Sequence, residues 1–284
     1  MLRMLVIVGT LMVIAAAPTR GEGILEQLRS NVREADESDD DDDRHHKKHR
    51  RSSYSHHDCD DDDDGDGFFG TMFLGVVTSP WTLPNAVIED DNDPPIDFAA
   101  FPYAEGHDGY LFVTSPHPDN VYGFGTRYSQ EVGSNLDGLT RVGGQLLFES
   151  DTRLGLDTQW NRFTEERPGG GHDELWTGDV NAIIRFAQGE KVQFQTGLGF
   201  NYLADSIGSD FGINFTYGAD FFPVHPWVIS AHTDLGTLGN TSRVHLRTTV
   251  GIMMNRFELF TGYDFERFGQ TNLQGPLLGL RLWW

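Results

Sequence analysis

Cysteine, lysine and long apolar runs are almost absent from this chain of 284 residues. The single cysteine, Cys59, excludes an internal disulfide and a cysteine-rich metal site. No internal run of 18 or more apolar residues occurs, so a transmembrane helix is not expected beyond the N-terminus. Lysine occurs only as Lys47, Lys48 and Lys191. Because soluble β-proteins place lysine on outer faces and sheet edges, this scarcity argues against an ordinary soluble sheet.

Positive charge is scarce as a whole. The net charge is -22 and the pI is near 4.6. A nucleic-acid partner is therefore not expected, because nucleic acids bind basic faces. Much of the negative charge lies in one acidic region near the N-terminus.

Residues 1–21 are predicted to be a secretory signal peptide. A positive residue precedes the apolar core Leu5–Ile14, and the small residues 15–17 follow. Pro18 argues against cleavage directly after these alanines, so cleavage nearer Gly21 or Gly23 is an open alternative. An uncleaved anchor is a second alternative, although the apolar run is short for a membrane span.

Residues 22–67 form a charged, low-complexity linker. A short amphipathic helix is expected at its start, over 23–37, because Leu25, Leu28 and Val32 have helical spacing. The remainder alternates aspartate runs with a basic, histidine-rich block and contains too few apolar residues to bury a core. A solvated linker in the periplasm is the favoured interpretation.

The same linker contains the opening of a calcium loop. Asp60, Asp62 and Asp64 match D-x-D-x-D, but Thr71 stands where a bidentate glutamate is required. No cofactor is therefore predicted, and Ca²⁺ or Zn²⁺ binding in this acidic, histidine-rich segment is only a weak alternative.

Residues 68–119 are first apolar and aromatic, then rich in proline and aspartate, with one short strand expected near 109–114. Prolines interrupt the apolar part, which is too short to span a membrane as a helix. Three roles are open for this lead-in segment: it lies at the membrane interface, covers the periplasmic mouth of a barrel, or enters the lumen as a plug.

From residue 120 to 284, apolar and polar residues alternate one for one. In 191–203, Phe194 and Phe200 fall on one face while Gln195 and Asn201 fall on the other. A period of two is typical of β-strands, and a tilted strand of about 9–11 residues crosses a bilayer. The sequence predicts an antiparallel up-and-down transmembrane β-barrel with strands at about 120–132, 138–149, 151–162, 174–187, 191–203, 210–222, 226–237, 241–253, 255–266 and 275–284.

The connections between these segments alternate in length. Short turns are expected at 149–152, 188–190, 223–226 and 254–255, and longer loops at 133–138, 163–174, 204–209, 238–241 and 267–275. Bacterial outer-membrane barrels place short turns in the periplasm and longer loops outside. With an even number of strands, both ends of the barrel are then periplasmic.

Aromatic residues support the same arrangement, because amphipathic rings prefer membrane interfaces. On these features residues 120–284 resemble the outer-membrane β-barrel proteins of Gram-negative bacteria as a class. The resemblance implies outer-membrane lipids as partners and a terminal strand that the barrel-assembly machinery binds, and it brings no catalytic residues. The predicted belt residues are Tyr122, Trp227 and Trp284 at the periplasmic end and Trp160, Trp176 and Tyr202 at the outer end.

The polar face of the strands would line the lumen. It mixes both signs of charge, and a ten-stranded barrel is narrow enough for side chains to fill it. A salt-bridged, narrow lumen is therefore expected. Its predicted network consists of Arg127, Arg141, Glu149, Arg153, Asp157, Asp179, Arg185, Asp220, His232, Asp234, Arg243, His245, Arg247, Glu258, Asp264 and Arg281, with Glu131 and Gln145 on the same face.

These features favour a small outer-membrane barrel with a structural or anchoring role. A passive, porin-like channel for small solutes or ions is the alternative. A hydrolase is a third hypothesis, because Ser230, His232 and Asp234 share one strand face, but residues two apart on a strand diverge. A soluble lipid-binding barrel is a further alternative, and its polar face would be richer in lysine and glutamate. Glu165, Glu166, His172 and Asp173 form a second candidate cluster on the outer rim.

Overall fold

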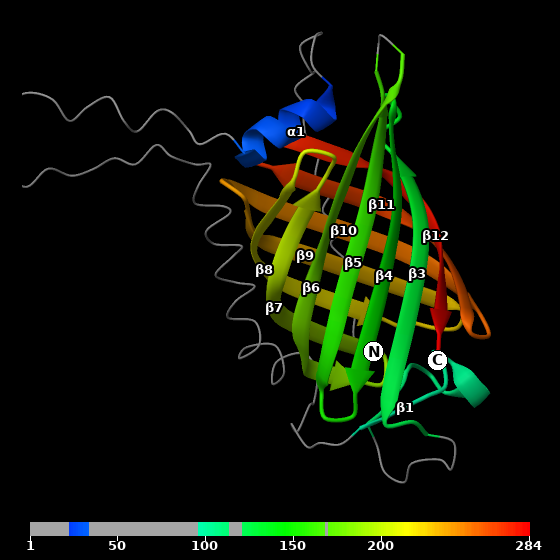
Figure 1. The fold of residues 1–284 in the computed structure, drawn as a ribbon. Coiled ribbons are helices and arrows are strands. Elements are labelled where there is room, and N and C mark those ends of the chain that lie inside the picture. The colour runs from blue at the N-terminus through cyan, green and yellow to red at the C-terminus, as the bar shows by residue number, and fades with distance from the viewer. Residues whose placement is uncertain (1–22, 34–95, 114–120, 168–169) are drawn as a thin grey trace, which may run out of the picture.

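A closed barrel of ten antiparallel strands forms the centre of the computed structural model, which describes residues 23–33, 96–113, 121–167 and 170–284. Each strand pairs with its neighbours in sequence, and the last pairs with the first, so the connectivity is up-and-down (Figure 1). The predicted fold class is confirmed. The strands are β3 (Phe124–Ser134), β4 (Leu139–Ser150), β5 (Leu154–Glu166), β6 (His172–Gly189), β7 (Val192–Ala204), β8 (Ser209–Phe221), β9 (Trp227–Leu238), β10 (Thr241–Met254), β11 (Phe257–Phe268) and β12 (Thr271–Trp283).

The two faces of the wall have opposite chemistry. Leu198 and Ile213 point outward and are 64% and 72% exposed, whereas Asn201 and Asn214 point inward and are fully buried. A water-soluble barrel would bury its apolar face, because apolar area gains free energy when it leaves water. An apolar outer surface around a polar interior is the arrangement of a barrel that is surrounded by lipid.

The loops predicted to be long are shorter than expected. β5 continues to Glu166 and β6 begins at His172, and only residues 269–270 separate β11 from β12. The ladder continues through polar pairs such as Glu165 opposite Asp173 and Arg267 opposite Asn272. Backbone pairing does not require apolar side chains, so the end of the apolar alternation did not mark the end of the strands. Loop length is therefore a weaker indicator of sidedness than the sequence suggested.

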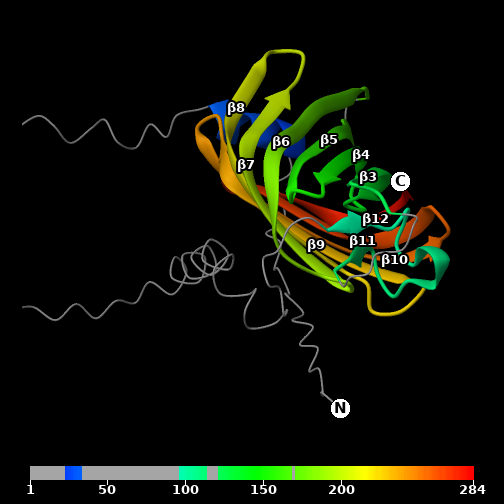
Figure 2. The ribbon, with the colours of Figure 1, turned by 90° about the horizontal axis from the view of Figure 1, so that it is seen from below.

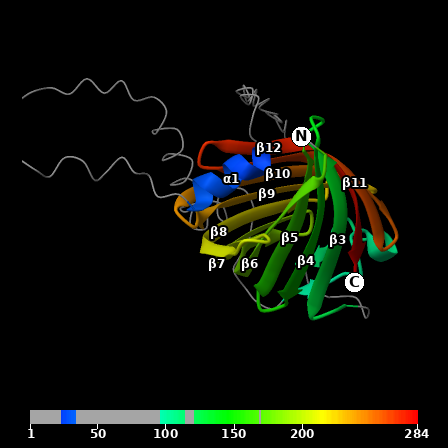
Figure 3. The same ribbon diagram turned by 45° about the horizontal axis from the view of Figure 1, so that its top comes forward.

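Two segments that precede the barrel lie at its opposite ends. The helix α1 (Ile24–Arg33) lies across one mouth (Figure 3). The other mouth is covered by β1 (Asp97–Phe98), the short 3-10 helix η2 (Ala104–Gly106) and β2 (Leu111–Phe112), close to the C-terminus (Figures 1 and 2). Within the described ranges, no helix has the length and apolar character needed to cross a membrane.

Candidate functional site

The lumen is bridged by ion pairs between strands on opposite sides of the ring. Arg127 on β3 donates to Asp220 on β8 across 2.9 Å, and these strands are five places apart in the ring of ten. Arg243 on β10 pairs with Asp179 on β6 at 3.2 Å. All four side chains are at most 3% exposed. These pairs therefore run through the lumen and do not line a water-filled channel.

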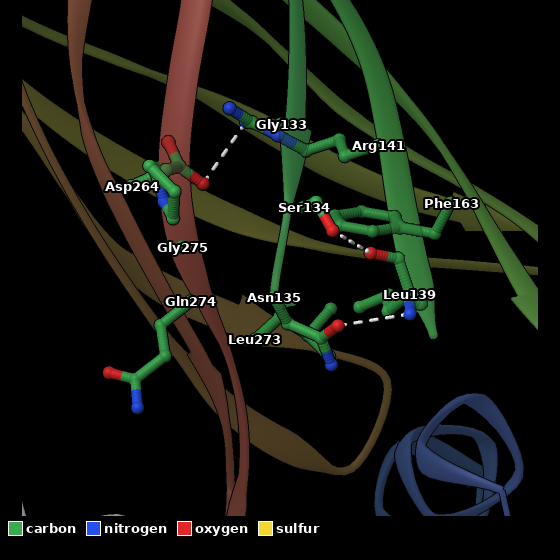
Figure 4. A pocket seen from close by; sticks show the side chains of 11 residues that line it. Gly133, Ser134, Asn135, Leu139, Arg141, Phe163, Asp264, Leu273, Gln274 and Gly275 are labelled. Carbon is green, nitrogen blue, oxygen red and sulfur yellow. Dashed lines mark hydrogen bonds and ion pairs between the residues drawn. The ribbon is translucent and has the colours of Figure 1, made fainter. Parts of the chain in front are cut away.

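A second group of pairs closes the lumen beside the seam between β12 and β3. Arg141 contacts Glu131 at 2.9 Å and Asp264 at 3.0 Å, and Arg247 also pairs with Glu131. Figure 4 shows Arg141 and Asp264 pointing toward each other across a small hollow at this seam. The hollow has a volume of about 20 Å³, which is room for about one water molecule.

His245 lies between two carboxylates. Its Nδ1 is 2.9 Å from Asp234 and its Nε2 is 2.9 Å from Asp264, and β10 carries it between β9 and β11. The imidazole is fully buried. Both ring nitrogens are therefore engaged in the wall network, and neither is presented to a substrate.

Near the mouth where β3 begins and β12 ends, two further ion pairs close the lumen. Arg185 donates to Glu149 at 2.9 Å, and Arg281 donates to Glu258 at 2.8 Å. Trp283, the penultimate residue, points inward and donates its indole N–H to Glu258 at 3.0 Å. The terminal strand is thus attached to the interior by a charged and an aromatic side chain.

The predicted lumen residues are buried inside the barrel, with one exception. Arg153 lies in the turn before β5, with φ of 71°, because β5 begins later than expected. Asp157 accepts a hydrogen bond from Gln145 at 2.9 Å. Glu266, which pairs with Arg243 at 2.8 Å, was missed, although it lies two residues after Asp264 on the same strand face and the period of two would have included it.

The hydrolase hypothesis depended on Ser230, His232 and Asp234. The Ser230 hydroxyl donates to Asp220 at 2.6 Å, and His232 lies 3.5 Å from Arg127. Asp234 is bonded to His245. The three side chains thus bond to different partners, and the serine is not aligned with the histidine that would have to accept its proton.

At the mouth that α1 lies across, acidic residues of the barrel bind the arginines of the helix. Arg29 pairs with Asp173 and Asp205, each at 2.6 Å, and Arg33 pairs with Asp205 at 3.0 Å and Asp210 at 2.8 Å. The Asp205 side chain is fully buried. Asp173 belongs to the rim cluster noted in the sequence, and its function here is to bind the protein's own helix.

The apolar face of α1 fills the same mouth. Leu25, Leu28 and Val32 are fully buried and pack on an inward-facing ring of leucines and phenylalanines. The alternation pattern assigns the apolar residues of the strands to the outer face, so it does not predict this ring. In the sequence, the ring is marked by a shift in the alternation of apolar and polar residues: near one end of a strand, the inward-facing position becomes apolar. The ring consists of Leu139, Phe163, Leu175, Leu203, Leu238, Phe268 and Leu273.

The described part of the lead-in segment, residues 96–113, covers the other mouth. Phe98, Tyr103 and Tyr110 form one buried cluster with Trp283 and with Phe222 of the β8–β9 connection. The Tyr103 hydroxyl donates to the backbone carbonyl of Trp227 at 2.6 Å. Burial, together with the charge of Asp108, raises the pKa of Tyr103 to about 12. This phenol therefore stays neutral and remains a hydrogen-bond donor.

The predicted belt residues have outward-facing side chains. Tyr122, Trp176, Trp227 and Trp284 are exposed. Trp160 lies at the middle of β5, because the strand extends past its expected end, and its ring covers Gly144, where a Cβ would be only 2.5 Å from the indole. Asp60, Asp62 and Asp64, the weak metal candidates, lie outside the described residues.

We expect the attachment of α1 to weaken in acid. Burial opposes ionisation of Asp205, but hydrogen bonds from Arg33, Ile207 and Gly208 and from Arg29 outweigh it and hold its pKa below the ordinary value of 3.8. A depressed pKa stabilises the docked helix above the ordinary value, and this contribution is lost as the pH falls through the lowered pKa. A fluorophore on Glu26→Cys, in a Cys59→Ser background, should lose anisotropy below about pH 4.

Asp205→Asn is the matched variant for this experiment. It should show low anisotropy already at pH 7, with little further change in acid. If Asp205→Asn shows the same high anisotropy at pH 7 as the parent protein, Asp205 does not control the helix.

Two of the solved structures that are similar to this chain are a β domain and a porin. No protein-family model matches the chain, and no curated protein is similar to it. The β domain of the Bordetella autotransporter BrkA matches with 12% identity and a TM-score of 0.32, over 57% of this chain and 99% of that one. The KdgM porin matches with 8% identity and a TM-score of 0.25, over 56% of this chain and 98% of that one. Similarities of this size assign no function, and the predicted barrel architecture rests on the closed ring of ten strands itself.

Proposed function

We propose that this protein is a small outer-membrane β-barrel with a structural or anchoring role and a closed lumen. The observation that carries the proposal is the Arg127–Asp220 pair, which joins opposite sides of the ring at 2.9 Å with both side chains buried. A conducting pore needs a continuous water-filled path, and the open aqueous channels among barrels have about 16–18 strands. The alternative of a passive porin-like channel has no comparable supporting contact.

The outer face and the last strand support an outer-membrane location. Exposed apolar side chains surround the barrel, and lipid is the medium in which such a surface is stable. In this proposal, the mouth where β3 begins and β12 ends is periplasmic. Outer-membrane lipids contact the outward-facing side chains of the strands. The barrel-assembly machinery would bind β12.

Conductance in planar lipid bilayers tests the closed lumen. The purified full-length protein should insert without producing stable unitary current steps. A double variant, Arg127→Ala with Asp220→Ala, removes the pair that spans the diameter and serves as the comparison. Stable steps from the unaltered protein would contradict the closed lumen and favour the channel.

A further inference from the structure

A cavity of about 430 Å³ lies where residues 96–113, here called the cap, meet the rim of the barrel. Its walls are Phe101 and Phe112, three alanines of the cap, and Tyr122 just before β3. Small-molecule sites have volumes of about 300–1,000 Å³ and are mostly apolar, with a few polar groups that orient the ligand. The hollow near Arg141, by contrast, has about 20 Å³. The cavity at the cap therefore has the size and the chemistry of a site for an amphipathic molecule.

The walls of this cavity are held in place by the core of the cap. Ala100, Phe101 and Phe112 are partly buried and pack against the cluster that contains Phe98 and Trp283. Trp283 belongs to β12, so the cap and the barrel share this core. The cavity is therefore a fixed feature of the covered mouth and not a gap between two independent parts.

Arg256 gives the cavity a positive charge. It lies in the turn between β10 and β11, and its guanidinium donates to the backbone carbonyls of Ala100 at 3.3 Å and Trp283 at 3.5 Å. The Phe101 ring packs on it, with its centroid 5.5 Å from Cζ. Among the described residues, these contacts are with carbonyls and a ring, and none is with a carboxylate. Since a guanidinium has five N–H donors, donors and a full charge remain for an anionic group.

The neighbours of Arg256 place it close to the lipid head groups. Met254 ends β10 and Phe257 begins β11, and their outward-facing side chains are 54% and 55% exposed. Tyr122, in the wall of the cavity, is 44% exposed. In a transmembrane barrel, outward apolar residues contact lipid, and aromatic rings gather where the hydrocarbon meets water. The cavity therefore borders the level at which the barrel meets one leaflet.

We infer that this cavity binds one anionic phospholipid of the periplasmic leaflet, with an acyl chain against Phe101 and Phe112 and the phosphate on Arg256. The inference rests on the proposed outer-membrane location and adds a ligand site to it. Arginine matches phosphate oxygens with planar, weakly hydrated donors, and basic pockets at the membrane bind anionic head groups. Glu105 also lines the cavity, but it is exposed and has another interaction. Arg256 is thus the residue on which recognition of the head group depends.

Native mass spectrometry of the full-length protein in dodecylmaltoside tests the inference, with dioleoylphosphatidylglycerol as the probe. The parent protein should retain one molecule of this lipid and should retain dioleoylglycerol, which lacks the phosphate, much less. Arg256→Gln should weaken binding by about ten- to a hundredfold, as expected for loss of a hydrogen bond to a charged group. Arg256→Lys keeps the charge and should bind more tightly than Arg256→Gln. Equal retention of the two lipids by the parent protein would overturn the inference.

An arginine at the opposite mouth provides the matched control. Arg267 is exposed, and its Nε donates to the Gly269 carbonyl at 2.7 Å. Arg267→Gln therefore removes the same charge away from the cavity, and it should retain phosphatidylglycerol as the parent protein does. If Arg267→Gln and Arg256→Gln weaken binding equally, the lipid is held by the overall charge of the barrel and not by this site.

Thiol protection locates the bound lipid. Ala100→Cys, in a Cys59→Ser background, places a thiol on the cavity wall. In delipidated protein, phosphatidylglycerol at ten times its Kd should slow the reaction with a water-soluble maleimide about tenfold, because only the unbound fraction reacts. Asp137→Cys, in an exposed turn at the other mouth, should react at the same rate with and without lipid. If Ala100→Cys is already unreactive without lipid, the protein's own chain fills the cavity and the inference is wrong.

Failure of this inference is distinguishable from failure of the proposed function. A protein that needs detergent to stay in solution, but shows neither the lipid adduct nor the protection, is a membrane barrel without this site. A protein that stays soluble without detergent contradicts the outer-membrane location itself.

Discussion

Replacing Asp220 with alanine is expected to lower the free energy of unfolding by about 3–5 kcal/mol, because one partner of a buried ion pair is removed and the other charge remains buried. Arg127 would lose its partner at 2.9 Å, and Ser230 and Gln193 would each lose an acceptor. The loss spans the ring from β8 to β3, so it should loosen the whole barrel. Denaturant titration in detergent, followed by tryptophan fluorescence, measures it.

Two variants make this prediction specific. Arg127→Met with Asp220→Leu removes both charges, and it should recover much of the stability because neither charge is left buried and unpaired. Asp137→Asn changes a carboxylate in an exposed turn and should change the free energy of unfolding by less than about 0.5 kcal/mol. If Asp220→Ala is as stable as Asp137→Asn, the pair does not hold the lumen closed.

The sequence predicted the barrel well because one physical rule governs most of it. A wall between lipid and a polar interior requires side chains to alternate with a period of two, and Leu198, Asn201 and Ile213 each lie on the face that this rule assigns. The number of strands followed from the same pattern. The interior partners did not follow, because periodicity gives the face of a residue and not its neighbour across the lumen. The Arg127–Asp220 pair depends on the strand order and the tilt of the ring.

The two mouths were the least predictable parts. Leu203 and Phe268 interrupt the alternation of their strands and point inward, so a rule that assigns apolar residues to lipid places them on the wrong face. The partner that makes this favourable, Leu28, lies far away in the sequence. The helix itself was predictable from its spacing, but its docking depends on tertiary contacts that local pattern does not contain.

Replacing Leu28 with aspartate is expected to release α1 from the barrel. Leu28 is fully buried in the ring that contains Leu203 and Phe268. The change removes about 1.5–3 kcal/mol of apolar burial, and it places a carboxylate among apolar side chains, where an unpaired charge costs far more. A ten-residue helix is only marginally stable by itself in water. Once undocked, α1 should therefore unfold and not remain as a free helix.

Trypsin susceptibility measures this release directly. Arg29 and Arg33 are held by Asp173, Asp205 and Asp210 in the docked helix, so cleavage after them requires α1 to open. A loss of about 3 kcal/mol should raise the rate about a hundredfold, since each 1.4 kcal/mol is a factor of ten and such cleavage follows the opening equilibrium. Peptides that end at these arginines, identified by mass spectrometry, give the rate.

The exposed face of the same helix supplies the control. Glu26 is exposed, so Glu26→Ala changes the charge of α1 without changing its packing, and its cleavage rate should remain within a fewfold of the parent protein. The barrel should resist trypsin in both variants, because the cross-lumen pairs do not involve α1. Equal cleavage of Leu28→Asp and Glu26→Ala would mean that the apolar ring does not retain the helix. The attachment of α1 to the barrel would then depend on the aspartates alone, and the low-pH experiment on Asp205 would become the decisive measurement.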